Sequence, residues 1–114
     1  MAEIVLIEAN EAFTHVALRG RLDVTGVEDV ELELTQQTFA RRKPAIVDIS
    51  AVDILASIGV GMLVKTARSM HSHGLIIGVV ATGTSKDVLE RLKVNTIFPV
   101  VATYEEALRT LMLR

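Results

Sequence analysis

The sequence contains no cysteine and no tryptophan, and its 114 residues include only one tyrosine and three phenylalanines. Without cysteine the chain forms no disulfide, has no thiol nucleophile and has no cysteine-ligated zinc site. The scarcity of aromatic side chains leaves little material for base-stacking platforms or aromatic ligand cages. The core must therefore be aliphatic, and the lack of cysteine fits a reducing compartment such as the cytoplasm.

An excess of charge of one sign is absent as well. The chain has 12 Lys and Arg against 14 Asp and Glu, so a net charge of −2 provides no basic surface for nucleic acid. Half of the residues are hydrophobic, yet no apolar run approaches the ~20 residues that cross a bilayer, and residues 1–8 lack signal-peptide features. We expect one cytoplasmic domain over residues 1–114, without nucleic acid partners or direct membrane insertion.

Short apolar segments alternate with helical patterns along the chain. The segments 3–8 and 13–19 predict a β-hairpin, and three further strands are predicted at 45–49, 75–81 and 99–102. Helical patterns cover approximately 26–39, 58–73, 86–92 and 104–113. Strands that alternate with helices need crossover connections. We therefore predict an α/β fold, a single domain whose mostly parallel mixed sheet has an N-terminal hairpin and about four helices.

Capping signals predict where several helices begin and end. Thr25 with Glu28, and Thr103 with Glu106, have the spacing of a capping box, in which each side chain satisfies a backbone donor of the first turn. Gly74 is placed to end the second helix in the left-handed conformation.

Ser57 stands between an apolar strand and a helical pattern that contains Gly59 and Gly61. A serine in this place is typical of a helix N-cap, which contributes ~1 kcal/mol. The same place favours a phosphate, because free backbone N–H groups and the helix dipole meet there. The two glycines allow either close backbone packing or close approach of a partner to Ser57.

Residues that catalyse reactions or bind metals are not grouped in the sequence. His71 and His73 are two positions apart on a predicted helix and cannot share one ligand face, and His15 lies alone in a predicted edge strand. The nucleophile elbow, the P-loop and the dinucleotide-binding glycine motif do not occur. We therefore expect no enzymatic activity, no metal site and no cofactor.

The predicted helix that follows Ser57 has two faces. Ile58 and Met62 lie opposite its apolar stripe, so we expect them to face outward beside Ser57 as a contact surface. The stripe consists of Val60, Leu63, Val64, Ala67 and Met70. The acidic run between residues 28 and 33 predicts a solvated helix face, with docking of a basic partner as the alternative.

Two segments resemble the STAS domain family, the fold of bacterial anti-sigma factor antagonists. Gly20-Arg-Leu-Asp23 is similar to the family's Gly-x-Leu-Asp segment. Asp48-x-Ser-x-Val-x-x-Leu-x-Ser57-x-Gly-x-Gly61 resembles the family's signature around a phosphoacceptor serine. The order of the predicted elements also matches from end to end. The resemblance implies a non-enzymatic phosphoprotein of bacterial signal transduction and transcription regulation, an anti-anti-sigma factor.

The resemblance further implies a partner-switching mechanism. The unphosphorylated antagonist binds a GHKL-type serine kinase that is also the anti-sigma factor and so frees sigma; phosphorylation of Ser57 by that kinase ends the binding, and a PP2C-type phosphatase reverses it. Asp23, Ile58, Gly59 and Met62 are then expected at the partner-binding surface.

The family usually has an acid before the phosphoacceptor and Ser or Thr after it, whereas this chain has Ala56 and Ile58. That difference keeps a second hypothesis open, a non-phosphorylated docking subunit of a larger signalling or membrane-transport complex. The ends of parallel strands leave a small-molecule enzyme or sensor as a third hypothesis.

Overall fold

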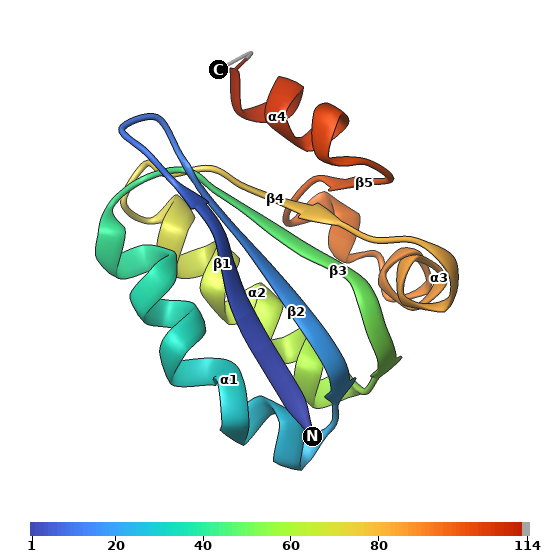
Figure 1. The fold of residues 1–114 in the computed structure, drawn as a ribbon. Helices are drawn as coiled ribbons and strands as arrows, with labels where there is room; N and C mark the ends of the chain where they lie inside the picture. The colour runs from blue at the N-terminus through green and yellow to red at the C-terminus, as the bar shows by residue number, and fades with distance from the viewer. Residues whose placement is uncertain (113–114) are drawn as a thin grey trace.

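The computed structural model describes residues 1–112 and contains one five-stranded sheet with helices packed on it (Figure 1). The strands are β1 (Ala2–Ala9), β2 (Thr14–Leu22), β3 (Ala45–Leu55), β4 (Ile77–Val80) and β5 (Val100–Val101). The helices are α1 (Val24–Gln37), α2 (Ser57–His71), α3 (Gly83–Arg91) and α4 (Tyr104–Met112), with short 3-10 turns at Phe39–Arg41 and Val94–Thr96. This order confirms the predicted α/β alternation, while the predicted helix end at residue 113 lies outside the described residues.

The strands are arranged in the order β1-β2-β3-β4-β5, with β1 antiparallel to β2 and the other pairs parallel. The predicted hairpin is confirmed, and Asn10 organises its turn because its Oδ1 accepts from the N–H groups of Ala12 and Phe13 at 2.7 and 2.9 Å. The prediction of an edge strand at His15 is wrong, because β2 is paired on both sides and β1 forms the edge.

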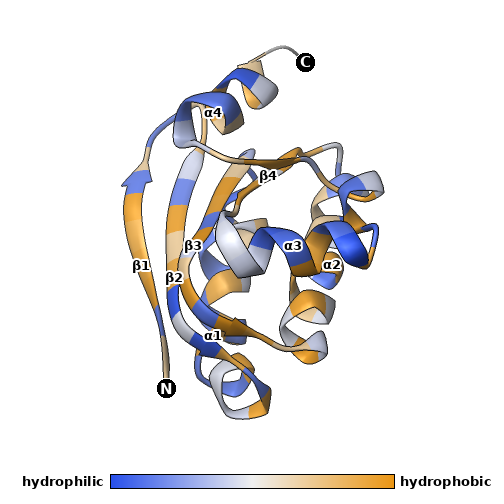
Figure 2. Cartoon of the chain, turned by 90° about the vertical axis from the view of Figure 1, so that its right-hand side faces the viewer, coloured by the Kyte–Doolittle hydropathy of each residue, from blue (hydrophilic) through white to orange (hydrophobic). Residues whose placement is uncertain are grey.

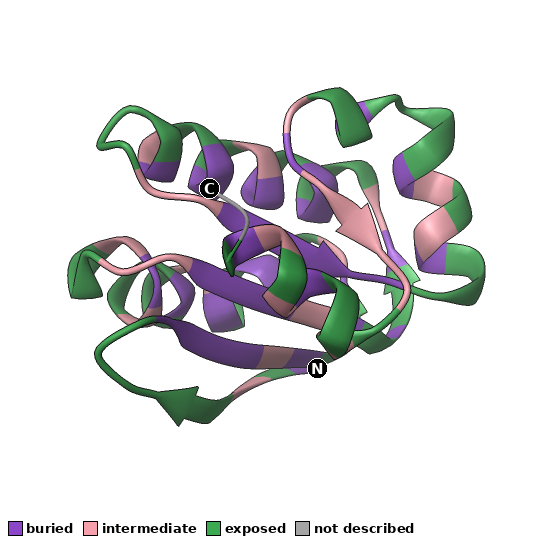
Figure 3. Ribbon diagram, turned by 90° about the horizontal axis from the view of Figure 1, so that it is seen from above, coloured by how far each residue is buried: buried purple, intermediate pink, exposed green. Residues whose placement is uncertain are grey.

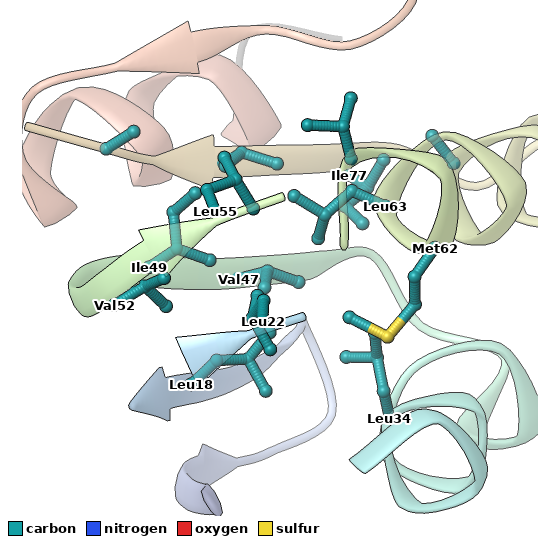
Figure 4. Close-up of a cluster of buried hydrophobic side chains, with 14 of the residues drawn as sticks. Leu18, Leu22, Leu34, Val47, Ile49, Val52, Leu55, Met62, Leu63 and Ile77 are labelled. Atoms are coloured by element: carbon teal, nitrogen blue, oxygen red, sulfur yellow. The ribbon is translucent and has the colours of Figure 1, made fainter. Parts of the chain in front are cut away.

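Two hydrophobic clusters lie on opposite faces of the sheet, as the alternation of side chains along β3 requires. Val47 and its neighbours on one face meet α1 and α2 in the larger cluster, part of which is drawn in Figure 4. Ile46 points to the other face, where α4 covers a smaller cluster of Phe13, Ile46, Val80, Ala107 and Leu111. Figure 2 shows α4 at the end of the sheet away from α1, and Figure 3 shows buried residues along the strands and the inner helix faces.

The capping predictions had different outcomes at the two boxes. Thr103 caps α4 as predicted, since its Oγ1 accepts from the N–H of Glu106 at 3.2 Å. The predicted box of Thr25 and Glu28 is wrong: α1 begins at Val24, and Asp23 is its N-cap. The carboxylate of Asp23 caps the helix directly before its first residue, Val24. Thr25 is therefore already the second residue of the helix. Gly74 has φ of +73°, which confirms the left-handed stop after α2.

The part of β3 beyond Asp48 extends past the end of β4. Helix α3 packs along this extension, and the Ser85 hydroxyl donates to the Val52 carbonyl at 3.5 Å. None of the helices within residues 1–112 combines the length and the apolar character that crossing a membrane requires.

Candidate functional site

The carboxyl ends of β2 and β3 lie side by side, and a helix begins immediately after each (Figure 1). Leu22 pairs with Leu55 in the parallel register, and the Ala56 N–H donates to the Leu22 carbonyl at 3.1 Å. The first turns of α1 and α2 therefore lie at the same edge of the sheet. This edge contains both segments that carry the sequence signature, one ending in Asp23 and the other centred on Ser57.

The two strand-to-helix junctions have corresponding sequences, Leu22-Asp-Val-Thr-Gly-Val27 and Leu55-Ala-Ser-Ile-Gly-Val60. The glycine is the third helical residue in each. A Cβ on Gly59 would lie 2.7 Å from the Leu22 oxygen, and one on Gly26 would lie 1.7 Å from the Arg21 oxygen. Both helices thus approach the end of β2 at a distance that only glycine permits.

This packing corrects one predicted site residue. Gly59 was expected to contact a partner, but it is buried against Leu22 and its role is to position α2. Gly61 is exposed, and no other part of the protein within residues 1–112 lies within 4 Å of the place where its Cβ would be, so the outer side of α2 is open there.

The start of α1 is closed by Asp23. Its Oδ1 accepts from the Gly26 N–H at 3.0 Å, and its Oδ2 faces the Arg21 Nε at 3.3 Å. The hydrogen bond from Gly26 is the main reason that the pKa of Asp23 is lowered, and Arg21 adds to the effect. Asp23 nevertheless keeps 38% of its side chain exposed, so it remains accessible at the surface.

The start of α2 has no side-chain cap. Its N-cap is Ala56, whose carbonyl accepts from the N–H groups of Gly59 and Val60 at 2.9 and 3.1 Å. The prediction that Ser57 caps the helix is therefore wrong, because Ser57 is one residue too late and is itself helical. Among residues 1–112, no group accepts from the N–H of Ser57 or Ile58, and the exposed Ser57 hydroxyl makes no hydrogen bond.

Apolar side chains are exposed on the elements that meet at this edge of the sheet. Ile58 is 44% exposed and faces outward as predicted. Two more exposed apolar residues were not predicted from the sequence: Val24 at the first position of α1 is 58% exposed, and Ile54 near the end of β3 is 42% exposed. Only the register of β2 and β3 brings them to this edge, so periodicity along one element does not find them. We call Val24, Ile54 and Ile58 the apolar rim.

The prediction that Met62 faces outward is wrong. Met62 is only 3% exposed, and Figure 4 shows its side chain reaching toward Leu34 of α1. Helix α2 is covered by the sheet on one side and by α1 on another, so its buried face is wider than the single stripe that a helical wheel gives. Met62 therefore supports the site from below and does not line its surface.

The remaining candidate residues do not assemble a second site. His71 is exposed, and His73 packs edge-on against Phe39 at 4.8 Å between ring centres. Within residues 1–112 no cluster of three or more His, Asp or Glu side chains could hold a metal ion. On the acidic face of α1, Glu31 pairs with Lys65 of α2 at 3.7 Å, and the other carboxylates are exposed.

Solved structures share this fold. An anti-sigma factor antagonist from Mycobacterium paratuberculosis superposes with a TM-score of 0.88 at 23% identity, covering 98% of this chain and 95% of that chain. The anti-sigma factor antagonist SpoIIAA in its unphosphorylated form gives a TM-score of 0.69 at 19% identity, covering 96% and 98%. The Bacillus cell fate determinant SpoIIAA in its phosphorylated form gives 0.69 at 18% identity, covering 98% and 100%.

A comparison with curated proteins gave no match. The model of one protein family, described as the STAS domain, matches residues 5–107. This match includes both strand-to-helix junctions and extends into α4. The chain therefore belongs to the STAS domain family.

Proposed function

We propose that the protein is an anti-sigma factor antagonist that binds an anti-sigma serine kinase in the cytoplasm and is switched off by phosphorylation of Ser57. The observation that carries this proposal is the exposed Ser57 hydroxyl at the uncapped first turn of α2. The family and the structural likeness to anti-sigma factor antagonists support the class of protein. In this mechanism the protein acts by binding and has no enzymatic activity of its own.

The geometry supports the proposal that Ser57 accepts a phosphate without a large change in the fold. A phosphate adds about −1.5 to −2 charges and three acceptor oxygens. At Ser57 these oxygens lie near two backbone N–H groups without partners and at the positive end of the α2 dipole. The first turn of α2 contains no acidic residue that would repel the added charge.

The same phosphate would prevent binding of the partner. The apolar rim offers Val24, Ile54 and Ile58 for a dry contact at the edge of the sheet that also carries the bare hydroxyl. A doubly charged group in the middle of that contact would have to lose its water without a compensating partner, which costs several kcal/mol. Asp23, next to the rim, supplies a fixed negative charge that a cation on the kinase can meet.

The phosphorylation itself is tested by incubating the chain with ATP and a GHKL-type anti-sigma kinase of the same organism. Intact-mass spectrometry should show one added phosphate on the natural chain and none on Ser57→Ala. Thr84→Ala is the matched control, because Thr84 is also an exposed hydroxyl in the first turn of a helix, and this variant should be labelled normally. Labelling of Ser57→Ala would contradict the proposal.

The switch is tested by measuring the affinity of the kinase for both forms. The unphosphorylated chain should bind, and the form phosphorylated on Ser57 should bind at least tenfold more weakly, an effect of about 1.4 kcal/mol or more. Treatment with a PP2C-type phosphatase should restore the affinity. Equal affinity of the two forms would contradict the switch while leaving the phosphorylation site intact.

A second candidate function is constitutive docking within a larger signalling or membrane-transport complex. It is favoured by the exposed Ile58 directly after Ser57 and by Ala56 directly before it, which make the site more apolar than the family's pattern. In this case Ser57→Asp should weaken binding of the partner only slightly, whereas Ile58→Asp should weaken it strongly. Equal binding by both variants would exclude the apolar rim as the contact surface.

A further inference from the structure

The smaller cluster under α4 contains a buried histidine whose surroundings leave one atom without a partner. His15 of β2 is 8% exposed, and its ring stacks on Tyr104 of α4 with 4.8 Å between ring centres and 26° between planes. The Nε2 atom of His15 is buried and has no hydrogen-bond partner within residues 1–112. Buried polar atoms without partners are uncommon in folded proteins, and each calls for a physical explanation.

Charged and titratable groups approach His15 from every element around it. Glu8 lies opposite it on β1, Asp48 lies on β3, and Tyr104 covers it from α4, with Glu105 close to Tyr104. The two carboxylates favour the imidazolium, but burial opposes it more strongly. Desolvation is the larger effect, so the pKa of His15 is lowered from its ordinary value of 6.5.

While Tyr104 covers the ring, burial therefore favours the neutral imidazole over the imidazolium. A proton on Nε2 would create a buried cationic N–H with no acceptor, and such a group is costly until water reaches it. Water can reach it if Tyr104 leaves the ring. Tyr104 is the first residue of α4, a helix of 9 residues held to the sheet mainly by Ala107 and Leu111.

We propose that His15 and Tyr104 form a proton-sensitive latch, in which protonation of the His15 ring releases α4 from the sheet. The sign follows from linkage. The open form binds a proton with the ordinary histidine affinity and the closed form binds it more weakly, so acid favours the open form. The closed form is favoured fully above pH of about 6.5 and progressively less as the pH falls below it.

Release of α4 would change the surface of the sheet. It would uncover the apolar residues Phe13, Ile46 and Val80, which α4 now buries. Beside them the sheet already has an open depression of about 220 Å³, lined partly by Val5, Ile7 and Ala17. The latch thus controls an apolar surface that lies at the opposite end of the parallel strands from Ser57, and it does not depend on phosphorylation.

Amide hydrogen exchange of the full chain at micromolar concentration tests the latch. Protection factors in α4, corrected for the intrinsic pH dependence of exchange, should fall roughly fivefold to tenfold between pH of about 7.5 and about 5.5. Protection in α1 should stay constant over the same range, because a local opening leaves the larger cluster intact. Constant protection in α4, or an equal fall in α1, would overturn the proposal.

Two variants make the test specific. His15→Phe keeps an aromatic stack with Tyr104 but cannot take up a proton, so the protection of α4 should no longer depend on pH. Tyr104→Ala exposes the ring, so His15 should titrate close to 6.5 by NMR, clearly above its value in the natural chain. A pH dependence of α4 that persists in His15→Phe, or a His15 titration unchanged by Tyr104→Ala, would overturn the latch.

Discussion

The starts of α1 and α2 have the same backbone arrangement but differ in one capping residue. Each follows a leucine at the end of a parallel strand, and each has glycine as its third helical residue packed on the end of β2. At α1 the residue before the helix is Asp23, which accepts from the Gly26 N–H. At α2 it is Ala56, which has no side-chain acceptor.

Because of this difference, the first amides of α1 are used within the fold, whereas in the described part of the chain the first amides of α2 are free to bind an anion such as a phosphate. Asp23 uses the first-turn amides of α1 to stabilise the fold, and its carboxylate leaves no room for another anion there. The amides of Ser57 and Ile58 stay without partners within residues 1–112, next to the exposed hydroxyl that we propose is phosphorylated. The uncapped start of α2 lacks the usual capping stabilisation of ~1 kcal/mol, and its unpaired amides are the groups that the proposed phosphate would use.

The largest effect on stability should come from replacing Gly59, the junction glycine of α2. Gly59→Ala places a Cβ 2.7 Å from a backbone oxygen, so we expect a loss of about 1–3 kcal/mol in the free energy of unfolding. Gly61→Ala is the matched control two residues later, where the Cβ meets no atom, and it should stabilise the chain by up to about 1 kcal/mol. Urea denaturation measures both, and equal effects of the two variants would contradict the close packing of α2 on β2.

Removal of the α1 cap should have the next largest effect. Asp23→Ala leaves the Gly26 N–H without its acceptor, so the thermal midpoint should fall. Asp23→Asn retains a capping oxygen and should be close to the natural chain at neutral pH.

The two Asp23 variants also differ in acid. Since the pKa of Asp23 is lowered in the fold, its stabilisation is present above about pH 4 and is lost as the pH falls through the folded value. Asp23→Asn should lack this part of the acid dependence. A natural chain and an Asp23→Asn variant with identical acid dependence would show that the carboxylate contributes nothing as a charge.

Adding a cap to α2 should make the two junctions alike. Ala56→Ser supplies the missing acceptor, so we expect the free energy of unfolding to rise by about 0.5–1 kcal/mol. The hydroxyl of the new Ala56→Ser side chain would also compete for the amides that a phosphate on Ser57 would use. Thermal or urea unfolding checks the first point, and a variant no more stable than the natural chain would show that the amides of α2 are already satisfied.

The smallest effect should come from Ser57 itself. Its hydroxyl makes no hydrogen bond within residues 1–112, so Ser57→Ala should change the free energy of unfolding by no more than about 0.5 kcal/mol. A loss of about 1 kcal/mol or more in the same measurement would instead mean that Ser57 caps α2 in solution.

The order of elements and the sheet type could be predicted from the sequence, because alternation, apolar runs and turn residues are local signals. The hairpin, the crossover helices and the stop at Gly74 belong to this class. The start of α1 could not be fixed in this way, since Asp23 and Thr25 are both good capping residues. The choice between them depends on where Leu22 ends its strand.

The candidate site was predictable only in part. The exposed Ile58 follows from the sequence, and the predicted helix start at residue 58 is one residue later than the observed start of α2. The burial of Met62, however, depends on a second helix, α1, that packs across α2. Likewise, Val24 and Ile54 come to this edge through the β2–β3 register. His15 is covered by Tyr104, which is far from it in the sequence. These features arise from tertiary packing, which periodicity within one segment does not contain.

The most direct test of the account is the amide NMR spectrum of the chain with phosphoserine incorporated at position 57, compared with the natural chain. If the start of α2 is an open anion site, the amide protons of Ser57 and Ile58 should shift downfield and become more protected. The core amides of Val47 and Ile77 should stay unchanged, since both residues are fully buried in strands and lie outside α2. Shifts spread through the core, or no change at Ser57 and Ile58, would contradict the account.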